Sequence, residues 1–127
     1  MLGRARICGQ LAVLLLLPAC TREAPPVITP IAAIAAARAE YSNRVVNVRG
    51  TVHNPFFLRE ANARLYSLDD GSGRIVVIVG QSDLPQDGDT AIVTGQVQPP
   101  DVVAGVPVRL RMVERKREIV LPALRKN

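Results

Sequence analysis

The pattern of hydrophobic and polar positions divides the chain into an apolar leader, a helical stretch and a series of strands. Residues 11–17 (LAVLLLL) are an unbroken apolar run. Apolar residues then recur at helical spacing in residues 30–41, and they alternate with polar residues from position 45 onward. A helical period followed by a period of two predicts one helix ahead of a mostly β domain.

The helical stretch carries a start signal. Thr29 is a good N-cap residue, and Pro30 suits the first helical position because its missing N–H is not needed there. Ile31 and Ile34 then fall on one face of a helix that ends near Tyr41. We expect these two isoleucines to be its buried contacts.

Five strands are expected after the helix, separated by loops or turns rich in Gly, Pro, Asp and Asn. In residues 45–52 Val alternates with polar residues, whereas residues 74–79 (RIVVIV) are apolar on both faces. The sequence DDGSG at 69–73 predicts a tight turn between the second and third strands. The predicted strands are 45–52, 65–68, 74–79, 90–97 and 106–113, the last with a tail to 120; residues 53–63, 81–89 and 99–105 are predicted loops.

Three sequence elements resemble the OB-fold family related to nucleic-acid-binding OB domains. They are VVNVRGTV at 45–52, YSLDDGSGRIVV at 66–77 and DGDTAIVTGQV at 87–97. The resemblance implies an all-β fold, a small five-stranded OB-type barrel preceded by one short helix. Gly50 and Gly95 would let strongly coiled strands bend. The helix would close the bottom of the barrel, because the loop at 81–89 is too short for the helix that the family often has there.

The same resemblance implies a ligand surface on strands two and three and on the loops after strands one and four. Aromatic rings beside guanidinium groups can stack on a base or sugar and attract a phosphate. The alternative is that one Phe packs under its loop and the arginines are simply solvated. The surface would include His53 and the loop at 98–106, and its candidate ligand-binding residues are Phe56, Phe57, Arg59, Arg64 and Arg74.

A basic run lies near the end of the chain. In a continuous strand Arg109, Arg111 and Arg115 would share one face, followed by Lys116 and Arg117. The run has two interpretations. It is an anion-binding stripe, or it is a charged sheet edge that discourages pairing with other sheets.

The leader has the features of a targeting segment, with Arg4 and Arg6 ahead of an apolar run too short to span a bilayer. The residues Leu17-Pro18-Ala19-Cys20 resemble a bacterial lipobox, although Pro18 is a departure from the residues usual there. The resemblance implies acyl chains such as palmitate on Cys20 and cleavage before it. An ordinary signal peptide cut near Ala19, or an uncleaved apolar helix, is the alternative.

These boundaries predict a signal peptide at 1–19, a lipidated tether at 20–28, an OB-like domain at 29–122 and a tail at 123–127. Cys8 would leave with the leader, so the mature chain would keep a single cysteine at its first position. In enteric-type bacteria an Asp after the lipidated cysteine retains a lipoprotein in the inner membrane. The Thr21 of this chain therefore favours the outer membrane, facing the periplasm.

Composition adds little support for catalysis or metal chemistry. The chain has a formal net charge of +5, one histidine and no tryptophan. His53 has no second histidine near it for a metal site, and turn chemistry explains Asp69, Asp70, Asp87 and Asp89. No nucleophile or phosphate-loop motif is present, so we expect no enzyme and no cofactor. The expected function is a non-enzymatic binding module of the cell envelope with an envelope protein or polymer as its ligand; the alternative is single-stranded nucleic-acid binding.

Overall fold

The computed structural model of the chain describes residues 25–124. The leader, Cys20 and the first part of the tether lie outside these residues, so the predictions made for them stay predictions. In the described part no helix is long and apolar enough to cross a membrane.

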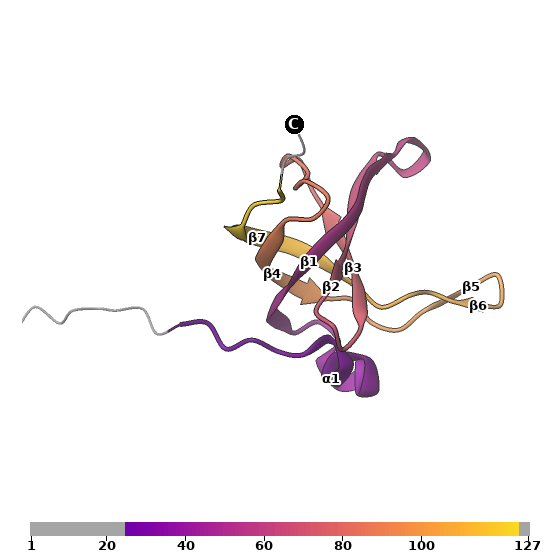
Figure 1. The fold of residues 1–127 in the computed structure, drawn as a ribbon. Helices are drawn as coiled ribbons and strands as arrows, with labels where there is room; N and C mark the ends of the chain where they lie inside the picture. Colours follow the sequence, from indigo (N-terminus) through magenta and orange to yellow (C-terminus); the bar gives the residue numbers. More distant parts are fainter. Residues whose placement is uncertain (1–24, 125–127) are drawn as a thin grey trace, which may run out of the picture.

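The domain is a closed β-barrel with a short helical segment before its first strand (Figure 1). Going round the barrel, the strands follow the order β1-β2-β3-β7-β4, and β4 pairs again with β1. All neighbours are antiparallel except β3 and β7, which are parallel. The elements are α1 (Ile31–Ala36), α2 (Arg38–Tyr41), β1 (Val45–Leu58), the 3-10 turn η1 (Arg59–Ala61), β2 (Ala63–Asp69), β3 (Arg74–Val79), β4 (Thr90–Val97), β5 (Val102–Val103), β6 (Val106–Pro107) and β7 (Arg111–Leu121).

Buried and exposed residues alternate along the barrel strands with the same period of two that apolar and polar residues show in the sequence. Alternate residues of β1 to β4 point inward and form one hydrophobic core. The predicted fold class is therefore confirmed. The inward set is Val46, Val48, Val52, Tyr66, Leu68, Ile75, Val77, Val79, Ala91, Val93, Val97 and Met112.

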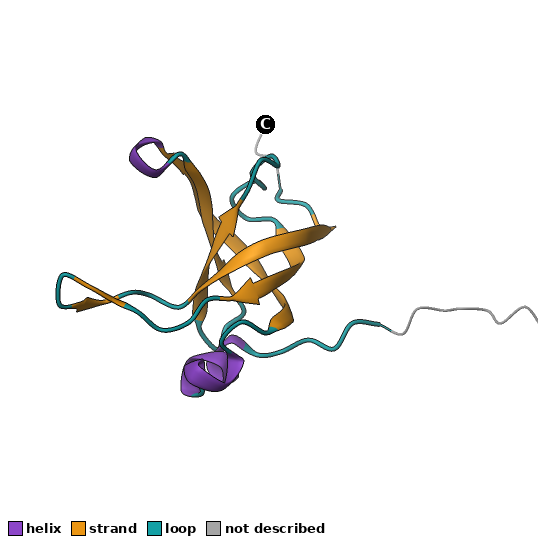
Figure 2. Cartoon of the chain, turned by 180° about the vertical axis from the view of Figure 1, so that it is seen from behind, coloured by secondary structure: helices purple, strands orange, loops and turns teal. Residues whose placement is uncertain are grey.

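The helix closes one end of this core, as expected (Figures 1 and 2). Ile31 and Ile34 are fully buried and belong to the same cluster as the strand residues. Gly73, in the turn after β2, leaves space for the helix: a Cβ added there would lie 3.2 Å from Cγ2 of Ile31.

The start of the helix differs from the prediction. Thr29 does not cap it; its N–H donates to the Asn47 carbonyl at 2.8 Å, alongside β1. Pro30 is the cap residue. Side chains of the β2–β3 turn accept hydrogen bonds from the first helical N–H groups. Ile31 N–H donates to Asp70 Oδ2 (2.9 Å) and Ala32 N–H donates to Ser72 Oγ (3.0 Å). The helix is also broken at Ala37, whose φ of −137° is not helical.

The predicted loop at 53–63 is wrong for most of its length. β1 continues to Leu58, and only η1 and Asn62 make the turn into β2. Asn54 and Pro55 read as a loop because both are turn residues. The strand absorbs them in a register shift between His53 and Phe56, where Asn54 adopts a positive φ of 49°. The result is a projecting ribbon, called here the β1–β2 hairpin (residues 54–65).

The predicted fifth strand at 106–113 is also corrected. Residues 102–107 form a separate two-stranded hairpin, β5 and β6, turning at Ala104 and Gly105 with φ of 53° and 80°. The barrel strand β7 begins only at Arg111 and runs to Leu121. The apolar residues 106–108 lead directly into the barrel strand, so the sequence pattern alone does not separate the β5–β6 hairpin from β7.

Candidate ligand-binding surface

One row of outward-facing side chains on the barrel is apolar. Residues that pair directly across neighbouring strands point to the same side of the sheet. Phe56 pairs with Leu65, Leu65 with Ile78, and Ile78 with Val113. Phe56 is 48% exposed and Val113 37%, while Leu65 and Ile78 are partly exposed. These four residues are called the apolar row.

The opposite side of the barrel is more polar. The outward residues of β1 include Asn47, Arg49 and Thr51, which pair with Thr94, Ile92 and Thr90 of β4. The Thr94 hydroxyl donates to Asn47 Oδ1 at 2.6 Å. The β1–β4 side of the barrel is therefore polar, whereas the β2–β3–β7 side carries the apolar row.

Two hairpins project from the barrel toward one side (Figures 1 and 2). The β1–β2 hairpin carries Phe57 and Leu58, both exposed. The β5–β6 hairpin carries Val102, Val103 and Val106, also exposed. Between the two roots of these hairpins lies the apolar row, because Phe56 and Leu65 belong to the first hairpin and Val113 follows the second.

The structure divides the aromatic and basic residues predicted to form one ligand site. Phe56 lies in the apolar row, whereas Phe57 pairs with Arg64, and both line a hollow of 130 Å³ with Asn62, Gly80 and Gln81. Arg59 is exposed in the η1 turn at the tip of the hairpin, and Arg74 begins β3. The structure thus brings Phe57 and Arg64 together, while the two phenylalanines lie on opposite faces of the ribbon.

Two of the three predicted arginines already have partners. Arg64 Nη1 donates to the carbonyls of Gln81 (3.0 Å) and Ser82 (2.9 Å). Arg74 Nε donates to Asp69 Oδ2 at 2.9 Å. The Gly71 N–H, and then Arg74, hold the pKa of Asp69 below its ordinary value. Because of these contacts, fewer N–H groups of each guanidinium are available to bind a phosphate.

The predicted basic stripe is not continuous. Arg109 precedes β7, and Arg111 is partly buried, with an Nη1 that has no hydrogen-bond partner in the described residues. The β4–β7 register shifts beside Gly95. As a result Arg115 has no residue of β4 paired with it, whereas its neighbours Glu114 and Lys116 do. The sheet-edge interpretation can apply only beyond Val113, because residues 112–113 have strands on both sides.

The last residue of that run, Arg117, belongs to a buried network that the sequence analysis missed. The Tyr66 hydroxyl donates to Glu114 Oε1 (2.6 Å), and Arg117 Nη1 donates to both Glu114 oxygens (2.9 and 3.2 Å). Only 15% of the Arg117 side chain and 6% of the Glu114 side chain are exposed. Burial, followed by Glu114, raises the pKa of Tyr66 well above its ordinary value. In the sequence, the sign of this network was an acidic residue, Glu114, at the start of the basic run ERKR.

The network also ties a loop to the barrel. Arg117 Nη2 donates to the Asp83 carbonyl at 2.6 Å, in the segment between β3 and β4. Arg117 also lies 5.8 Å from the centre of the Tyr66 ring. We interpret this cluster as structural, because its charges are paired and its side chains are largely withdrawn from solvent.

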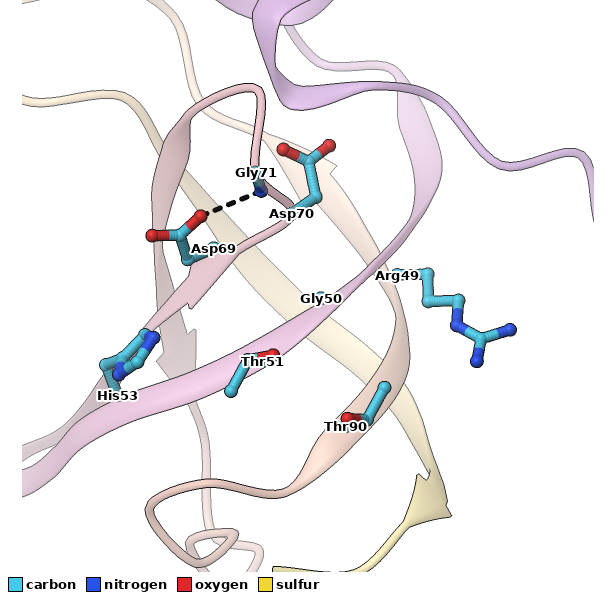
Figure 3. Close-up of a pocket in the computed structure, with 8 residues that line it drawn as sticks. All are labelled: Arg49, Gly50, Thr51, His53, Asp69, Asp70, Gly71 and Thr90. Atoms are coloured by element: carbon cyan, nitrogen blue, oxygen red, sulfur yellow. Dashed lines mark hydrogen bonds between the residues drawn. The ribbon is translucent and has the colours of Figure 1, made fainter.

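A larger open hollow, of 520 Å³, lies on the polar side of the barrel (Figure 3). Its two carboxylates serve the fold: Asp69 accepts the Gly71 N–H, and Asp70 accepts N–H groups of Ile31, Ser72 and Gly73. Arg49 points away from both of them in Figure 3. Among residues 25–124, no group of three His, Cys, Asp or Glu side chains is placed to hold a metal ion. The hollow is lined by Arg49, Gly50, Thr51, His53, Asp69, Asp70, Gly71 and Thr90.

This domain is an OB fold. It is defined as one by its strand order, by the parallel pairing of β3 with β7 and by the positions of its turns. Solved structures agree. A protein from Leishmania major Friedlin described as an aspartyl-tRNA synthetase is similar, with a TM-score of 0.65 and 14% identity, over 85% of this chain and 23% of that one. An aspartyl-tRNA synthetase from Entamoeba histolytica has a TM-score of 0.60 and 13% identity, over 80% of this chain and 23% of that one.

A third similar structure is an OBody bound to hen egg-white lysozyme, with a TM-score of 0.59 and 15% identity, over 78% of this chain and all of that one. This chain thus corresponds to less than a quarter of each synthetase and to the whole of the OBody. At these identities the likeness is one of fold. No protein-family model and no curated protein matches the sequence.

The apolar row was only partly predictable. Phe56 was among the predicted residues, but Leu65, Ile78 and Val113 were not. The signal was the strand RIVVIV, since apolar residues on both faces of a barrel strand place some of them outside.

Proposed function

We propose that the chain is a lipid-anchored, non-enzymatic binding module of the bacterial cell envelope, and that its OB domain holds a protein partner on the β2–β3–β7 face. The apolar row is the observation that carries the proposal. Four outward apolar side chains, one from each of four neighbouring strands, form a contiguous patch of the kind that marks a protein interaction site. The partner would present apolar side chains to it.

Lipid anchorage is supported by the sequence around Cys20 and agrees with the path of the chain that follows. Asn47 Nδ2 donates to the Val27 carbonyl (3.4 Å), and Thr29 is bonded to the same strand residue. The chain between Cys20 and Val27 can span at most about 25 Å when fully extended. An acylated Cys20 would therefore keep the barrel close to its membrane, with the outer membrane and the periplasm as the proposed location.

Capture from envelope extracts tests the binding face. We expect the unlipidated chain (residues 21–127) to retain a specific envelope protein and Ile78→Asp to retain at least tenfold less, because a carboxylate would lie in the middle of the apolar row. Ile92→Asp is the matched control, since Ile92 is a similarly half-exposed outward isoleucine on the polar side. Loss of capture in both variants, or in neither, would refute the assignment of the face.

Single-stranded nucleic-acid binding is the second candidate. One support is the fold shared with two proteins described as aspartyl-tRNA synthetases. The other is the exposure of Phe56, which lies on the same hairpin as Arg59. It predicts oligonucleotide affinity that falls steeply with salt and weakens in Phe56→Ala and Arg59→Ala. Fluorescence anisotropy at low salt decides the matter: undetectable binding removes this candidate.

A further inference from the structure

The β5–β6 hairpin exposes an aliphatic surface that nothing in the described chain covers. Val102, Val103 and Val106 are 61%, 60% and 64% exposed, the highest values among the valines of the barrel and its hairpins. Every residue from 99 to 107 is exposed. An aliphatic tip that projects this far is unfavourable in water unless something else receives it.

The chemistry of the hairpin suits a lipid interface. Residues 102–108 (VVAGVPV) contain no polar side chain. Their backbone pairs within the hairpin, at Val103 with Val106 and at Val102 with Pro107, and Val108 N–H donates to the Asp101 carbonyl. Pro107 has no N–H to leave unpaired. Backbone groups that are already satisfied lower the cost of leaving water.

The hairpin leaves the barrel at its helical end and projects to the side opposite to the one from which residues 25–30 approach (Figures 1 and 2). Arg38 of α2 donates from Nη2 to the Val108 carbonyl at 3.1 Å, which joins the root of the hairpin to the helical segment. That segment begins at Ile31, shortly after the proposed tether, which ends at Ile28. The β1–β2 hairpin tip points away from this end in both views.

The charges at the root of the hairpin are mostly positive. Arg109 is exposed directly after the hairpin, and Arg38 lies against its root. Asp101 is the acidic residue there, and its Oδ1 accepts the Val102 N–H. An aliphatic tip with cations behind it matches a membrane surface of anionic lipid, where acyl chains receive the tip and phosphates face the cations.

We propose that the β5–β6 hairpin inserts Val102, Val103 and Val106 at the boundary between the headgroups and the acyl chains of an anionic lipid membrane, with Arg109 against the lipid phosphates. This contact is separate from the apolar row and needs neither the acylated cysteine nor a partner protein. It would turn toward the membrane the side of the barrel from which the β5–β6 hairpin projects.

Vesicle sedimentation with the unlipidated chain (residues 21–127) tests the proposal. All core residues lie between Ile31 and Met112, so this chain contains the whole barrel core. We expect it to sediment with vesicles of phosphatidylethanolamine and phosphatidylglycerol more than with phosphatidylcholine alone. Val103→Ser with Val106→Ser should weaken the partition constant about tenfold or more, and Arg109→Gln about fivefold.

The control is a double serine replacement on the other hairpin, Phe57→Ser with Leu58→Ser, where both residues are also exposed. It should leave vesicle binding unchanged. The proposal fails if the parent chain does not sediment with anionic vesicles, or if the two double variants bind alike. It also fails if the valine variant keeps vesicle binding and loses only the captured protein, since the hairpin would then be a protein-docking element.

Fluorescence gives a second, positional readout. The chain has no tryptophan, so Val103→Trp introduces a single indole at the tip. Its emission should shift to the blue with anionic vesicles and be quenched by brominated acyl chains, whereas Leu58→Trp should show neither change. Equal responses at both sites would contradict insertion by the β5–β6 hairpin. Because no extract or lipidated protein is used, the result is independent of the proposed partner and anchor.

Discussion

At the scale of single residues, Gly95 explains how β4 and β7 approach each other where their pairing shifts register. A Cβ at this position would lie 2.8 Å from the Val113 carbonyl oxygen and 3.0 Å from Met112 Sδ. The carbonyl belongs to the paired strand β7 and cannot move without breaking the pairing. The glycine is required here by close approach rather than by a positive φ.

We therefore expect Gly95→Ala to lower the free energy of unfolding by about 2 kcal/mol, the usual cost of forcing a methyl group into a packed position. Gly80→Ala is the control: a Cβ there meets nothing within 4 Å, and its φ is not positive. Its effect should stay within about 0.5 kcal/mol. Urea unfolding followed by circular dichroism measures both, and equal values for the two variants would contradict the steric explanation.

Residue patterns also set how much of the site the sequence could reveal. The buried face of β1 follows from a local rule and was predicted. The continuation of β1 to Phe56 and Phe57 could not be predicted, because it depends on a register shift at two turn residues, Asn54 and Pro55. The partners of Arg64 and Arg117 are backbone carbonyls 17 and 34 residues away in sequence, which no local pattern encodes.

At the scale of elements, one carboxylate links the helix to the barrel. Asp70 accepts the Ile31 N–H at the start of α1, and its other oxygen accepts N–H groups of Ser72 and Gly73 in the β2–β3 turn. The helix therefore obtains its N-terminal cap from a turn about forty residues away, which explains why the local Thr29 cap was a wrong prediction.

This link predicts a pH dependence. Burial would raise the pKa of Asp70, but the N–H groups of Ile31, Ser72 and Gly73 and the Ser72 hydroxyl outweigh it and hold the pKa below the ordinary value. A lowered folded-state pKa means that the charged form stabilises the fold above about pH 4 and that this contribution is lost as the pH falls further.

Asp70→Ala should cost about 1–2 kcal/mol at pH 7, as for the loss of a helix cap. The difference in unfolding free energy between the parent chain and Asp70→Asn should shrink as the pH falls below about 4. Asp101→Asn, at an exposed position, should change the unfolding free energy at pH 7 by no more than about 0.5 kcal/mol. A gap for Asp70→Asn that stayed constant with pH would show that the carboxylate charge plays no part.

At the scale of the whole molecule, the two hairpins and the tether make the sides of the barrel different from one another. The proposed lipid contact is the tip of the β5–β6 hairpin, whose root is joined to the helical segment by Arg38. The apolar row lies on the barrel strands between the roots of the two hairpins, so the proposed lipid and partner contacts use different residues.

Anchorage itself is tested at this scale. We expect labelled palmitate to enter the parent protein in cells and not Cys20→Ser, and the Cys20→Ser protein to appear as a folded but misplaced domain or as an uncleaved precursor. Cys8→Ser is the control, because Cys8 would leave with the leader. Wild-type labelling of Cys20→Ser would rule out the proposed anchor.

The parallel pairing of β3 with β7 has a consequence for biogenesis. β7 is the last strand of the barrel to be synthesised, and it fills the place between β3 and β4. Until it emerges, the nascent chain is an open sheet with two unpaired edges, and closure must wait for contacts distant in sequence. Late closure of this kind would suit the proposed export, in which the polypeptide passes through a translocation channel before it folds.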